Sequence, residues 1–399
     1  MKANEKSIQN KVMPHTLKIL NGLWAIPFVL FIRLLKPIHL IKFSVLRSNR
    51  LGDWVLDTAQ LKLTPEKKIH RLVWFKEPCS NSFWAKIVKR NLKISQWAES
   101  PYYWNWKIPG GDEHNEVFLK DRDTEGLMEK DNSKLRFSFS EEENVNANSW
   151  LKSKGWSEGQ PFVCIIVRDS AYLKSSNLVE KIDWSYHSYR DTNINDYLPA
   201  MEWLTDQGIY VFRMGKVMEK PLVTKNKKII DYAFLEDKSD FLDIWLFANC
   251  NLCISTGTGP DFVSDFWRRP LLYLNYIPIG NAVSWSNSMS IPKNLYWKKS
   301  GKELSLKEHL KFTSYHNIEN SPDIGQRDLS KEEILVSVKE CWKFLSGSSK
   351  LTDEEKILNK KFWKIIKTQP EYRNQHRWIH PLARVGMSWL KNKEATFLR

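Results

Sequence analysis

The first part of the chain alternates short apolar runs with amphipathic patterns of helical period. Buried strands are predicted at Ile41–Leu46 and His70–Phe75, and a shorter strand at Leu92–Trp97. Helices are predicted after the turn at residues 50–53, where the pattern continues through Leu61, and at Asn81–Asn91. Strands that alternate with helices in this way favour a parallel sheet with helices on both faces.

The same alternation begins again after a polar stretch that extends from Tyr102 to about Asn148. The predicted strands are Phe162–Val167, Ile209–Met214, Ile229–Tyr232, Leu252–Ser255 and Leu271–Asn275. The predicted helices cover Ile194–Gln207, the residues from Ser239 to Ala248, and about Pro260 to Trp267. Beyond Leu304 the pattern is mainly helical, with the clearest segments at Lys331–Leu345, Asp353–Ile366 and Pro381–Leu390. The sequence therefore predicts an α/β protein in which one architecture occurs twice.

The length of the chain agrees with two domains. Domains commonly contain roughly 100–200 residues, and this chain has 399. The pattern divides it into an N-terminal basic and apolar segment at 1–40, a Rossmann-like domain at 41–150, a second Rossmann-like domain at 155–325, and a basic helical extension at 326–399.

The formal net charge of +15 indicates attraction to a polyanion, which is a nucleic acid, an anionic lipid or a phosphorylated substrate. The basic residues are densest towards both ends of the sequence. No zinc finger, RNA-binding aromatic motif or basic zipper accompanies them. We therefore expect no nucleic acid partner, although a nucleic-acid-binding protein stays an alternative.

The five cysteines favour free thiols in a reducing compartment, because their number is odd and three lie in apolar surroundings. Cys250 and Cys253 have the spacing of a zinc or redox motif. They lie at a helix end and at the start of an apolar strand, and no second Cys/His pair follows. We expect them to be structural.

The apolar run Ile19–Ile32 is shorter than the roughly 20 residues that a membrane-spanning helix needs. It contains Pro27 and is followed directly by Arg33 and Lys36. These features predict a helix that lies at a membrane interface with basic flanks. A helix that packs on the first domain is an equal alternative.

Two glycine-containing loops follow strands and open helices, which is where open α/β sheets bind ligands. The loop at residues 255–261 offers the better phosphate site, because two glycines let the backbone approach a diphosphate closely and hydroxyl groups add donors. The candidate ligands in this loop are Ser255, Thr256, Gly257, Thr258 and Gly259. A purely structural turn is an equal alternative at this point.

Arginines at strand ends strengthen the phosphate hypothesis. Arg168 follows the strand Phe162–Val167 directly, Arg213 ends another strand, and Arg190 lies in a nearby loop segment. Guanidinium groups bind phosphate oxygens in a bidentate manner. Since carboxyl ends of strands in one parallel sheet share an edge, these side chains are expected to converge.

Motifs of the second stretch resemble, in content and order, an uncharacterised family of bacterial glycosyltransferases. The match covers roughly residues 40–300. The resemblance is carried by Val167–Tyr172, His187–Asp191, Arg213–Lys216, Ile230–Ala233, Ser239–Ile244, Gly257–Gly259, and Arg269–Pro270 leading to Asn275 and Pro278. It implies the GT-B fold, with two facing Rossmann-like domains, C-terminal helices, and a nucleotide-sugar donor held mainly by the second domain. It adds Gly215 and Asn275 to the donor-binding candidates.

The first loop, Arg50–Asp53, is similar to the opening loop of the heptosyltransferases. In those enzymes an aspartate at the position of Asp53 is thought to act as general base on the acceptor hydroxyl. Members of the closer family often have Gly-His there, so Gly-Asp is a departure. The alternative is that Asp53 caps the following helix, which aspartate does well.

Other groups could also serve as the base. Asp169, His187 and Asp191 are the further candidates, and His187 has a suitable ordinary pKa near 6.5. Asp169 could instead orient Arg168, and a lone histidine beside aromatic residues is more often structural. Asp121 and Asp123 have the spacing of a metal-binding Asp-x-Asp motif, but they lie in a polar region that we interpret as a solvated charge cluster.

We therefore predict a glycosyltransferase that transfers a sugar from a nucleotide-sugar donor, with neither metal nor cofactor. The expected acceptor is a cell-surface glycan or a lipid-linked precursor. The expected location is the cytoplasm, peripherally at the inner face of the plasma membrane, in contact with anionic lipid. A catalytically degenerate protein that binds glycans or nucleotide sugars during polysaccharide assembly is the main alternative.

Overall fold

The computed structural model describes residues 15–64, 69–116, 122–135, 137–171, 189–312 and 321–399, with side chains from residue 19 onwards. The chain forms two compact units. Unit 1 comprises residues 1–121 and 131–138, and unit 2 comprises residues 122–130 and 139–399. Each unit is described by itself below.

Unit 1 is built on a small parallel sheet. Strands β1 (Leu40–Leu46) and β2 (Ile69–Phe75) pair in parallel over their whole length. Single parallel bridges extend the sheet on both sides, from Phe43 to Asn115 and from Val73 to Ile94. The helices of unit 1 are α2 (His15–Leu35), α3 (Leu51–Leu63), α4 (Ser82–Asn91), α5 (Glu99–Lys107), α7 (Asn132–Leu135) and the 3₁₀ turns η2 (Gln96–Ala98) and η3 (Asp112–His114).

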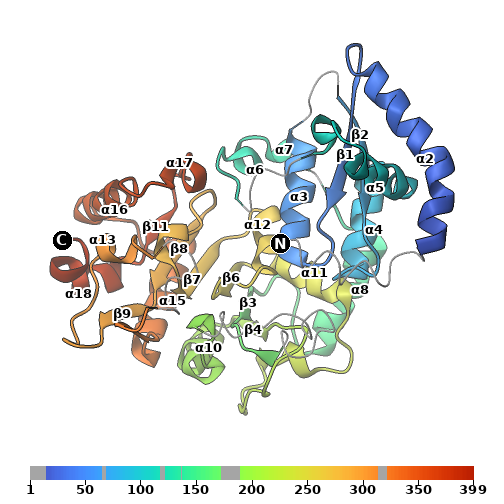
Figure 1. The fold of residues 1–399 in the computed structure, drawn as a ribbon. Coiled ribbons are helices and arrows are strands. Elements are labelled where there is room, and N and C mark those ends of the chain that lie inside the picture. The colour runs from blue at the N-terminus through green and yellow to red at the C-terminus, as the bar shows by residue number, and fades with distance from the viewer. Residues whose placement is uncertain (1–14, 65–68, 117–121, 136, 172–188, 313–320) are drawn as a thin grey trace. The chain divides into compact units, whose positions relative to one another are not determined.

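Helix α2 packs on α5 and on the sheet of unit 1 (Figure 1). Val29 and Ile32 are fully buried in a cluster with Phe43 and Trp74 of the two strands. At the end of α2, the Arg33 guanidinium donates hydrogen bonds to the Asn105 side chain and to the carbonyl oxygens of Asn105, Ile108 and Pro109. These contacts fix α2 to unit 1. None of the helices in the described ranges is long and apolar enough to cross a membrane.

Unit 2 contains a seven-stranded sheet in the order β11-β8-β7-β6-β3-β4-β5, in which every pair is parallel (Figure 1). The strands are β3 (Phe162–Ile166), β4 (Tyr210–Arg213), β5 (Ile229–Ile230), β6 (Leu252–Ser255), β7 (Leu271–Tyr276), β8 (Ser288–Pro292) and β11 (Arg384–Val385). The chain builds outward from β3 to β5, returns to place β6 beside β3, and builds outward again to the other edge. The strand order therefore reverses between β3 and β6, which is the position where doubly wound sheets bind ligands.

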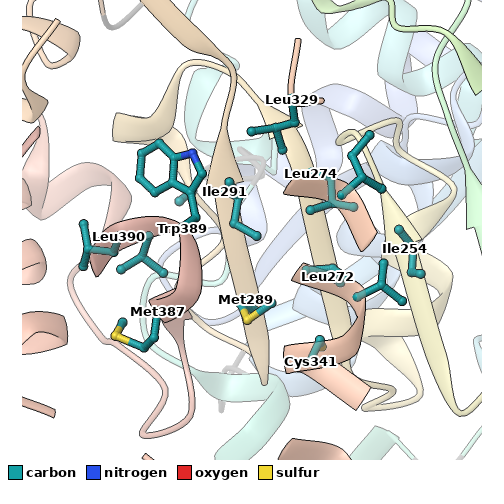
Figure 2. Packing of buried hydrophobic residues seen from close by; sticks show 14 of the residues in the cluster. Ile254, Leu272, Leu274, Met289, Ile291, Leu329, Cys341, Met387, Trp389 and Leu390 are labelled. Atoms are coloured by element: carbon teal, nitrogen blue, oxygen red, sulfur yellow. The ribbon is translucent and has the colours of Figure 1, made fainter. Parts of the chain in front are cut away.

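Helices pack on this sheet and bury its apolar residues (Figure 2). Leu272, Met289 and Ile291 of the sheet contact a cluster that includes Cys341 and Trp389 of the C-terminal helices. The main helices of unit 2 are α8 (Glu141–Ser153), α10 (Leu198–Asp206), α11 (Asp240–Asn249), α12 (Asp261–Phe266), α15 (Lys331–Leu345), α16 (Asp353–Ile366) and α18 (Met387–Phe397). The shorter elements are the helices α6 (Leu127–Lys130), α13 (Leu306–His309) and α17 (Tyr372–Gln375), the 3₁₀ turns η5 (Ile194–Tyr197), η6 (Tyr232–Phe234) and η7 (Ile279–Asn281), and the antiparallel pair β9 (Asn294–Trp297) and β10 (Ile324–Arg327).

The α/β class, two Rossmann-like units with parallel strands, and the C-terminal helices are all confirmed. The boundary between the units differs from the predicted one at residue 150, because α8 belongs to unit 2. The Trp245 indole donates a hydrogen bond to Asn144 of α8 at 3.0 Å, and Phe139 stacks on Trp267. The segment after residue 325 is also part of unit 2, since β11 completes the edge of its sheet.

Three predicted elements are wrong in extent. Leu92–Trp97 makes a single bridge at Ile94 and then turns into η2. The helix predicted from Ile194 starts as η5 and becomes α-helical only at Leu198. Pro381–Leu390 contains β11, and α18 begins only at Met387, because the apolar run there packs as a strand against β8 before the helix starts.

The buried histidine His376 makes the stability of unit 2 depend on pH. Its Nε2 lies 2.6 Å from the Gly280 carbonyl oxygen and its Nδ1 lies 3.0 Å from the Ser284 hydroxyl, so the neutral ring satisfies both partners. Burial lowers the pKa of His376 from 6.5 to about 4. The unfolded chain therefore binds a proton at a pH where the folded protein does not, and stability present above pH 6.5 is lost as the pH falls towards 4.

We expect the free energy of unfolding to fall by up to about 3 kcal/mol over this window through His376 alone. Urea unfolding of the full chain at a series of pH values measures this, and His376→Gln should have a flatter profile than the wild type. His39→Gln, at an exposed position of unit 1, is the matched control. An identical pH profile for wild type and His376→Gln would contradict the assignment.

Candidate functional site

The reversal point of the unit 2 sheet brings the loop after β3 next to the loop after β6. Arg168 follows β3 and Thr256 follows β6, and the Arg168 amide donates a hydrogen bond to the Thr256 hydroxyl at 3.0 Å. Thr256 is buried and Arg168 is partly exposed. The two loops are therefore fixed to each other at the place where ligands bind in this topology.

Arg190 joins the same place from a more distant part of the chain. Its guanidinium donates a hydrogen bond to the Gly257 carbonyl oxygen in the loop after β6. Burial lowers the pKa of Arg168, and the neighbouring charge of Arg190 lowers it further. Two guanidinium groups thus lie close enough to repel each other, which is the arrangement that an anionic ligand relieves.

Arg168 is oriented from one side only. Its Nε donates to the Asp191 carboxylate at 3.2 Å, and the pair is partly buried. No group within the described residues bonds the two terminal nitrogens of the Arg168 guanidinium. The planar fork of those nitrogens is the part of arginine that matches two phosphate oxygens.

A buried lysine that the sequence analysis did not identify supports this pair. Lys293 follows β8 at the same edge of the sheet and is only 2% exposed. Its ammonium group contacts the Asp328 carboxylate at 2.8 Å and donates to the Asp191 carbonyl oxygen at 2.7 Å. Burial raises the pKa of Asp191, while Arg168 and Lys293 lower it. Lys293 therefore positions the segment that orients Arg168, and the sequence analysis missed it because it predicted no strand at β8.

The glycine loop is not the open cradle of amides that the sequence suggested. The Gly257 amide donates to the Ser255 hydroxyl at 2.9 Å, and the Thr258 amide donates to the Asp261 carboxylate at 3.0 Å. The Ser255 hydroxyl also donates to Asp261, and burial raises the pKa of this carboxylate. Three of the expected phosphate donors, two amides and the Ser255 hydroxyl, are therefore already engaged within the loop.

The glycines of this loop are required by its shape. Gly257 and Gly259 have φ angles of 79° and 85°, which other residues rarely adopt. A side chain on Gly257 would also collide with the Tyr276 ring, which lies 2.8 Å from the position of its Cβ. The Thr258 hydroxyl is buried and has no hydrogen-bond partner among the described residues. The two glycines therefore allow the turn of this loop. The hydroxyl groups of Thr256 and Thr258 are the polar side-chain groups beside it.

Arg213 does not join Arg168 and Arg190. It is 1% exposed, and its guanidinium donates to the Asp231 carboxylate at 2.9 Å and to the Lys220 carbonyl oxygen at 3.3 Å. Gly215 follows it in a conformation that packs closely against Met218. Both residues stabilise the loop after β4, so the structure gives them a structural role in place of the predicted donor contact.

Asn275 is likewise structural. Its backbone is left-handed, with φ of 55°, and it is 1% exposed. Its side chain accepts a hydrogen bond from the Leu329 amide and donates to the hydroxyl groups of Thr192 and Tyr197. It therefore connects the end of β7 to two other loops at this edge, and we remove it from the donor ligands.

The base candidates of unit 2 are already engaged or lie outside the described residues. Asp169 accepts hydrogen bonds from the amides of Ala171 and Glu219, which connects the loops after β3 and β4. Asp191 pairs with Arg168 as described above. His187 lies outside the described residues, so its prediction is untested.

Asp53 lies in unit 1, in the first turn of α3 and at the carboxyl end of β1. Asp53 is not the N-cap residue of this helix, because the N-cap position is occupied by Arg50 and Asp53 lies in the first helical turn. Asp53 is partly exposed. The neighbouring Asp57 is fully buried and forms an ion pair with Arg47 at 2.7 Å, so Asp57 is the structural carboxylate of the pair and Asp53 the accessible one.

Asp123 is not solvated as the sequence suggested. It is 5% exposed and accepts hydrogen bonds from the amides of Leu127 and Met128, which fixes the start of a short helix. Within the described parts of the chain, no three His, Cys, Asp or Glu side chains gather in a way that could hold a metal ion. Cys250 and Cys253 are buried free thiols, as expected.

Comparison with known proteins gives matches of fold only. No protein-family model matches the chain, and no curated protein matches it. Among solved structures, a family 9 glycosyl transferase from Veillonella parvula DSM 2008 shows 12% identity and a TM-score of 0.43, over 78% of this chain and 98% of that chain. The ADP-heptose LPS heptosyltransferase II of E. coli shows 12% identity and a TM-score of 0.38, over 77% of this chain and 100% of that chain.

A UDP-GlcNAc 2-epimerase from Methanocaldococcus jannaschii shows 11% identity and a TM-score of 0.27, over 80% of each chain. Because these TM-scores are low, the function proposed below rests on the geometry of the site and not on these neighbours.

The structural role of Arg213 predicts a stability effect. Arg213→Met leaves the Asp231 carboxylate without its cation, so we expect a loss of about 3–5 kcal/mol in the free energy of unfolding. Chemical denaturation of the full chain measures this loss. Arg327→Met is the matched control, because Arg327 is exposed and its ion pair with Glu303 should contribute below about 1 kcal/mol. Equal effects of the two substitutions would argue against the structural role of Arg213.

Proposed function

We propose that this protein is a glycosyltransferase that transfers a sugar from a nucleotide-activated donor, whose diphosphate is bound by Arg168 and Arg190 in unit 2. The observation that carries the proposal is that the Arg168 backbone amide and the Arg190 guanidinium both bond the loop after β6, at the reversal point of a doubly wound sheet. The residues that gather there are the ones that carry the resemblance to bacterial glycosyltransferases.

The chemistry explains why arginines suit this position. As the bond between the anomeric carbon and the diphosphate oxygen breaks, the leaving nucleoside diphosphate takes the bonding electrons and gains negative charge. The terminal nitrogens of Arg168 can donate two parallel hydrogen bonds to it, while Asp191 holds the Nε side in place. Fixed cations in a partly buried site stabilise this charge without the reorganisation that water requires. We propose that these groups do so without a metal ion.

The acceptor hydroxyl must lose a proton as its oxygen attacks the anomeric carbon. We propose Asp53 as the base, because it is a partly exposed carboxylate in the first turn of α3, in the loop that is similar to the opening loop of the heptosyltransferases. The proton passes to the Asp53 carboxylate and the acceptor oxygen forms the new glycosidic bond. The proposed acceptor is a cell-surface glycan or a lipid-linked precursor.

A catalytically degenerate nucleotide-sugar-binding protein is the second candidate. The observation in its favour is that both aspartates beside Arg168 in unit 2 serve structural contacts. This candidate predicts donor binding without turnover. The two experiments below distinguish it from the transferase.

The role of the arginines predicts a loss of donor affinity without unfolding. Arg168→Ala and Arg190→Ala should each weaken binding of a nucleoside diphosphate or its sugar by tenfold to about a hundredfold, since a hydrogen bond to a charged group contributes roughly 1.5–3 kcal/mol. A thermal-shift panel of nucleoside diphosphates and nucleotide sugars identifies the ligand, because a bound ligand raises the unfolding temperature by mass action. Titration calorimetry with that ligand then measures each variant.

Arg327→Ala is the matched control, because it removes an exposed arginine of the same unit. It should bind like the wild type. If Arg168→Ala and Arg190→Ala both retain wild-type affinity, the assignment of the donor site is wrong.

The role of Asp53 predicts a loss of sugar transfer without a loss of donor affinity. Asp53→Asn should keep donor affinity and lose about two to four orders of magnitude in sugar transfer, which is the usual contribution of a general base. Donor hydrolysis and transfer are followed by release of the nucleoside diphosphate. Asp112→Asn, at an exposed position of unit 1, is the control. Wild-type protein that binds donors but never releases product would instead support the degenerate protein.

A further inference from the structure

Helix α2 has two apolar faces, and unit 1 covers only one of them. Ala25, Val29 and Ile32 are fully buried on the inner face. On the outer face, Leu23 and Leu34 are each 78% exposed. The other strongly exposed apolar residues of this segment are Ile19, Leu20, Trp24, Leu30, Phe31 and, just beyond the helix, Ile38. Large apolar side chains gathered in this way on a surface mark an interaction site.

The exposed residues form one continuous stripe. Leu20, Leu23, Phe31, Leu34 and Ile38 are separated by three, four or eight residues, so they recur on the same side of a helix. We refer to these five residues as the outer stripe. Figure 1 shows α2 alongside α5 at the margin of unit 1. The outer stripe therefore runs along the length of the helix on the side away from the packed face.

Tryptophans border the outer stripe. Trp24 is 42% exposed and lies 6.2 Å, between ring centroids, from Trp97 of η2, which is also strongly exposed. Phe28 contacts the same Trp97 ring edge-on at 5.4 Å. Exposed tryptophans next to an apolar stripe are typical of the boundary between lipid headgroups and acyl chains, where the indole ring is favoured.

The charge of the chain is concentrated in the unit that carries this stripe. Unit 1 has 22 lysines and arginines against 11 aspartates and glutamates, a net formal charge of +11 out of +15 for the whole chain. Unit 2, with twice as many residues, holds the remaining +4. Residues 6–52 contain eight lysines and arginines and no acidic residue. An anionic surface that also accepts apolar side chains complements both the positive charge of unit 1 and its outer stripe.

We infer that the outer stripe of α2 docks unit 1 on an anionic lipid bilayer, with the helix lying in the plane of the headgroups. The helix lies on the bilayer, because its inner face is buried in unit 1 and Arg33 donates to three carbonyl groups, one within α5 and two just after it. Burial of the leucines and phenylalanine provides the apolar part of the affinity, and the basic residues provide the electrostatic part. The inference stands on unit 1 alone and is independent of the proposed function.

Two other occupants fit the charge and the apolar stripe of unit 1 less well. A nucleic acid complements the positive charge. Its phosphate groups, however, bind basic and polar side chains and do not bind a stripe of leucines. A second copy of the chain would cover the apolar stripe, but it would bring two units of charge +11 together. Both are distinguishable outcomes of one experiment.

The test is co-sedimentation of the full-length protein with vesicles. We expect binding to phosphatidylcholine vesicles that contain about one third phosphatidylglycerol, and binding at least tenfold weaker without the anionic lipid or at high salt. Leu23→Glu/Leu34→Glu should lose at least tenfold in affinity for the anionic vesicles, because it removes two apolar side chains from the outer stripe and adds two negative charges. Both side chains are exposed, so the variant should fold normally.

Val223→Glu/Ile357→Glu is the matched control, since it places the same charges at exposed apolar positions of unit 2, and it should sediment like the wild type. Unchanged sedimentation of the α2 variant, or a wild type that ignores anionic vesicles, would overturn the inference. A wild-type dimer that only the α2 variant dissociates would assign the outer stripe to a second copy. Tight binding of duplex or single-stranded oligonucleotide that survives the α2 variant and competes with the vesicles would assign the charge to nucleic acid.

The outcome is separable from that of the proposed function. The α2 variant should keep donor affinity, while Arg168→Ala should keep vesicle binding. A negative result in the vesicle experiment therefore leaves the donor-binding experiment interpretable, and the reverse also holds.

Discussion

The hydrogen bond between the Arg168 amide and the Thr256 hydroxyl fixes the geometry of unit 2 at its reversal point. It connects the two loops that leave the sheet where the strand order turns back. Arg190 bonds Gly257, Asp191 pairs with Arg168, and Lys293, which follows β8, donates to the Asp191 carbonyl oxygen. The donor site that we propose depends on this one junction, because no single loop contains enough groups to bind a diphosphate.

Charge balance explains how such a site stays folded before its ligand arrives. Buried cations are stable only when they are paired, and Lys293 is paired with Asp328 while Arg168 is paired with Asp191. The loop after β6 also contains a buried charged group, the Asp261 carboxylate. This carboxylate accepts hydrogen bonds from the Thr258 amide and the Ser255 hydroxyl of the same loop. What remains for a ligand among the described residues is the side of the Arg168 guanidinium that carries its terminal nitrogens. This arrangement favours guanidinium groups over loop amides as the phosphate donors.

Unit 1 faces a different physical constraint. Its sheet is small, and α2 supplies much of the cover for Phe43 and Trp74 while exposing a second apolar face. A protein that worked only in water would replace Leu23 and Leu34 with polar residues at no cost to the core. The accumulation of positive charge in the same unit gives that exposed face a physical rationale, since apolar contact and charge attraction act together at a lipid surface.

The sequence by itself determined the α/β class, the strands β1, β2, β3, β6 and β7, and the helices α3, α11, α15 and α16 nearly to the residue. It could do so because these elements follow local rules of periodicity and capping. Ser239, for example, caps α11 with its side chain. The position of Arg168 beside the glycine loop was also predictable, because strand ends in a parallel sheet share one edge.

Only the tertiary structure decided which of the similar candidates have free surfaces. Arg213 looks like Arg168 in the sequence, yet Asp231 pairs with it inside the loop, and Asn275 is fully used as a hydrogen-bond hub. Lys293 is one basic residue among 61 until the fold buries it beside Asp328. The reason is physical. The local sequence pattern indicates which face of its helix or strand a side chain occupies. The partners of that side chain come from distant segments that only folding brings together.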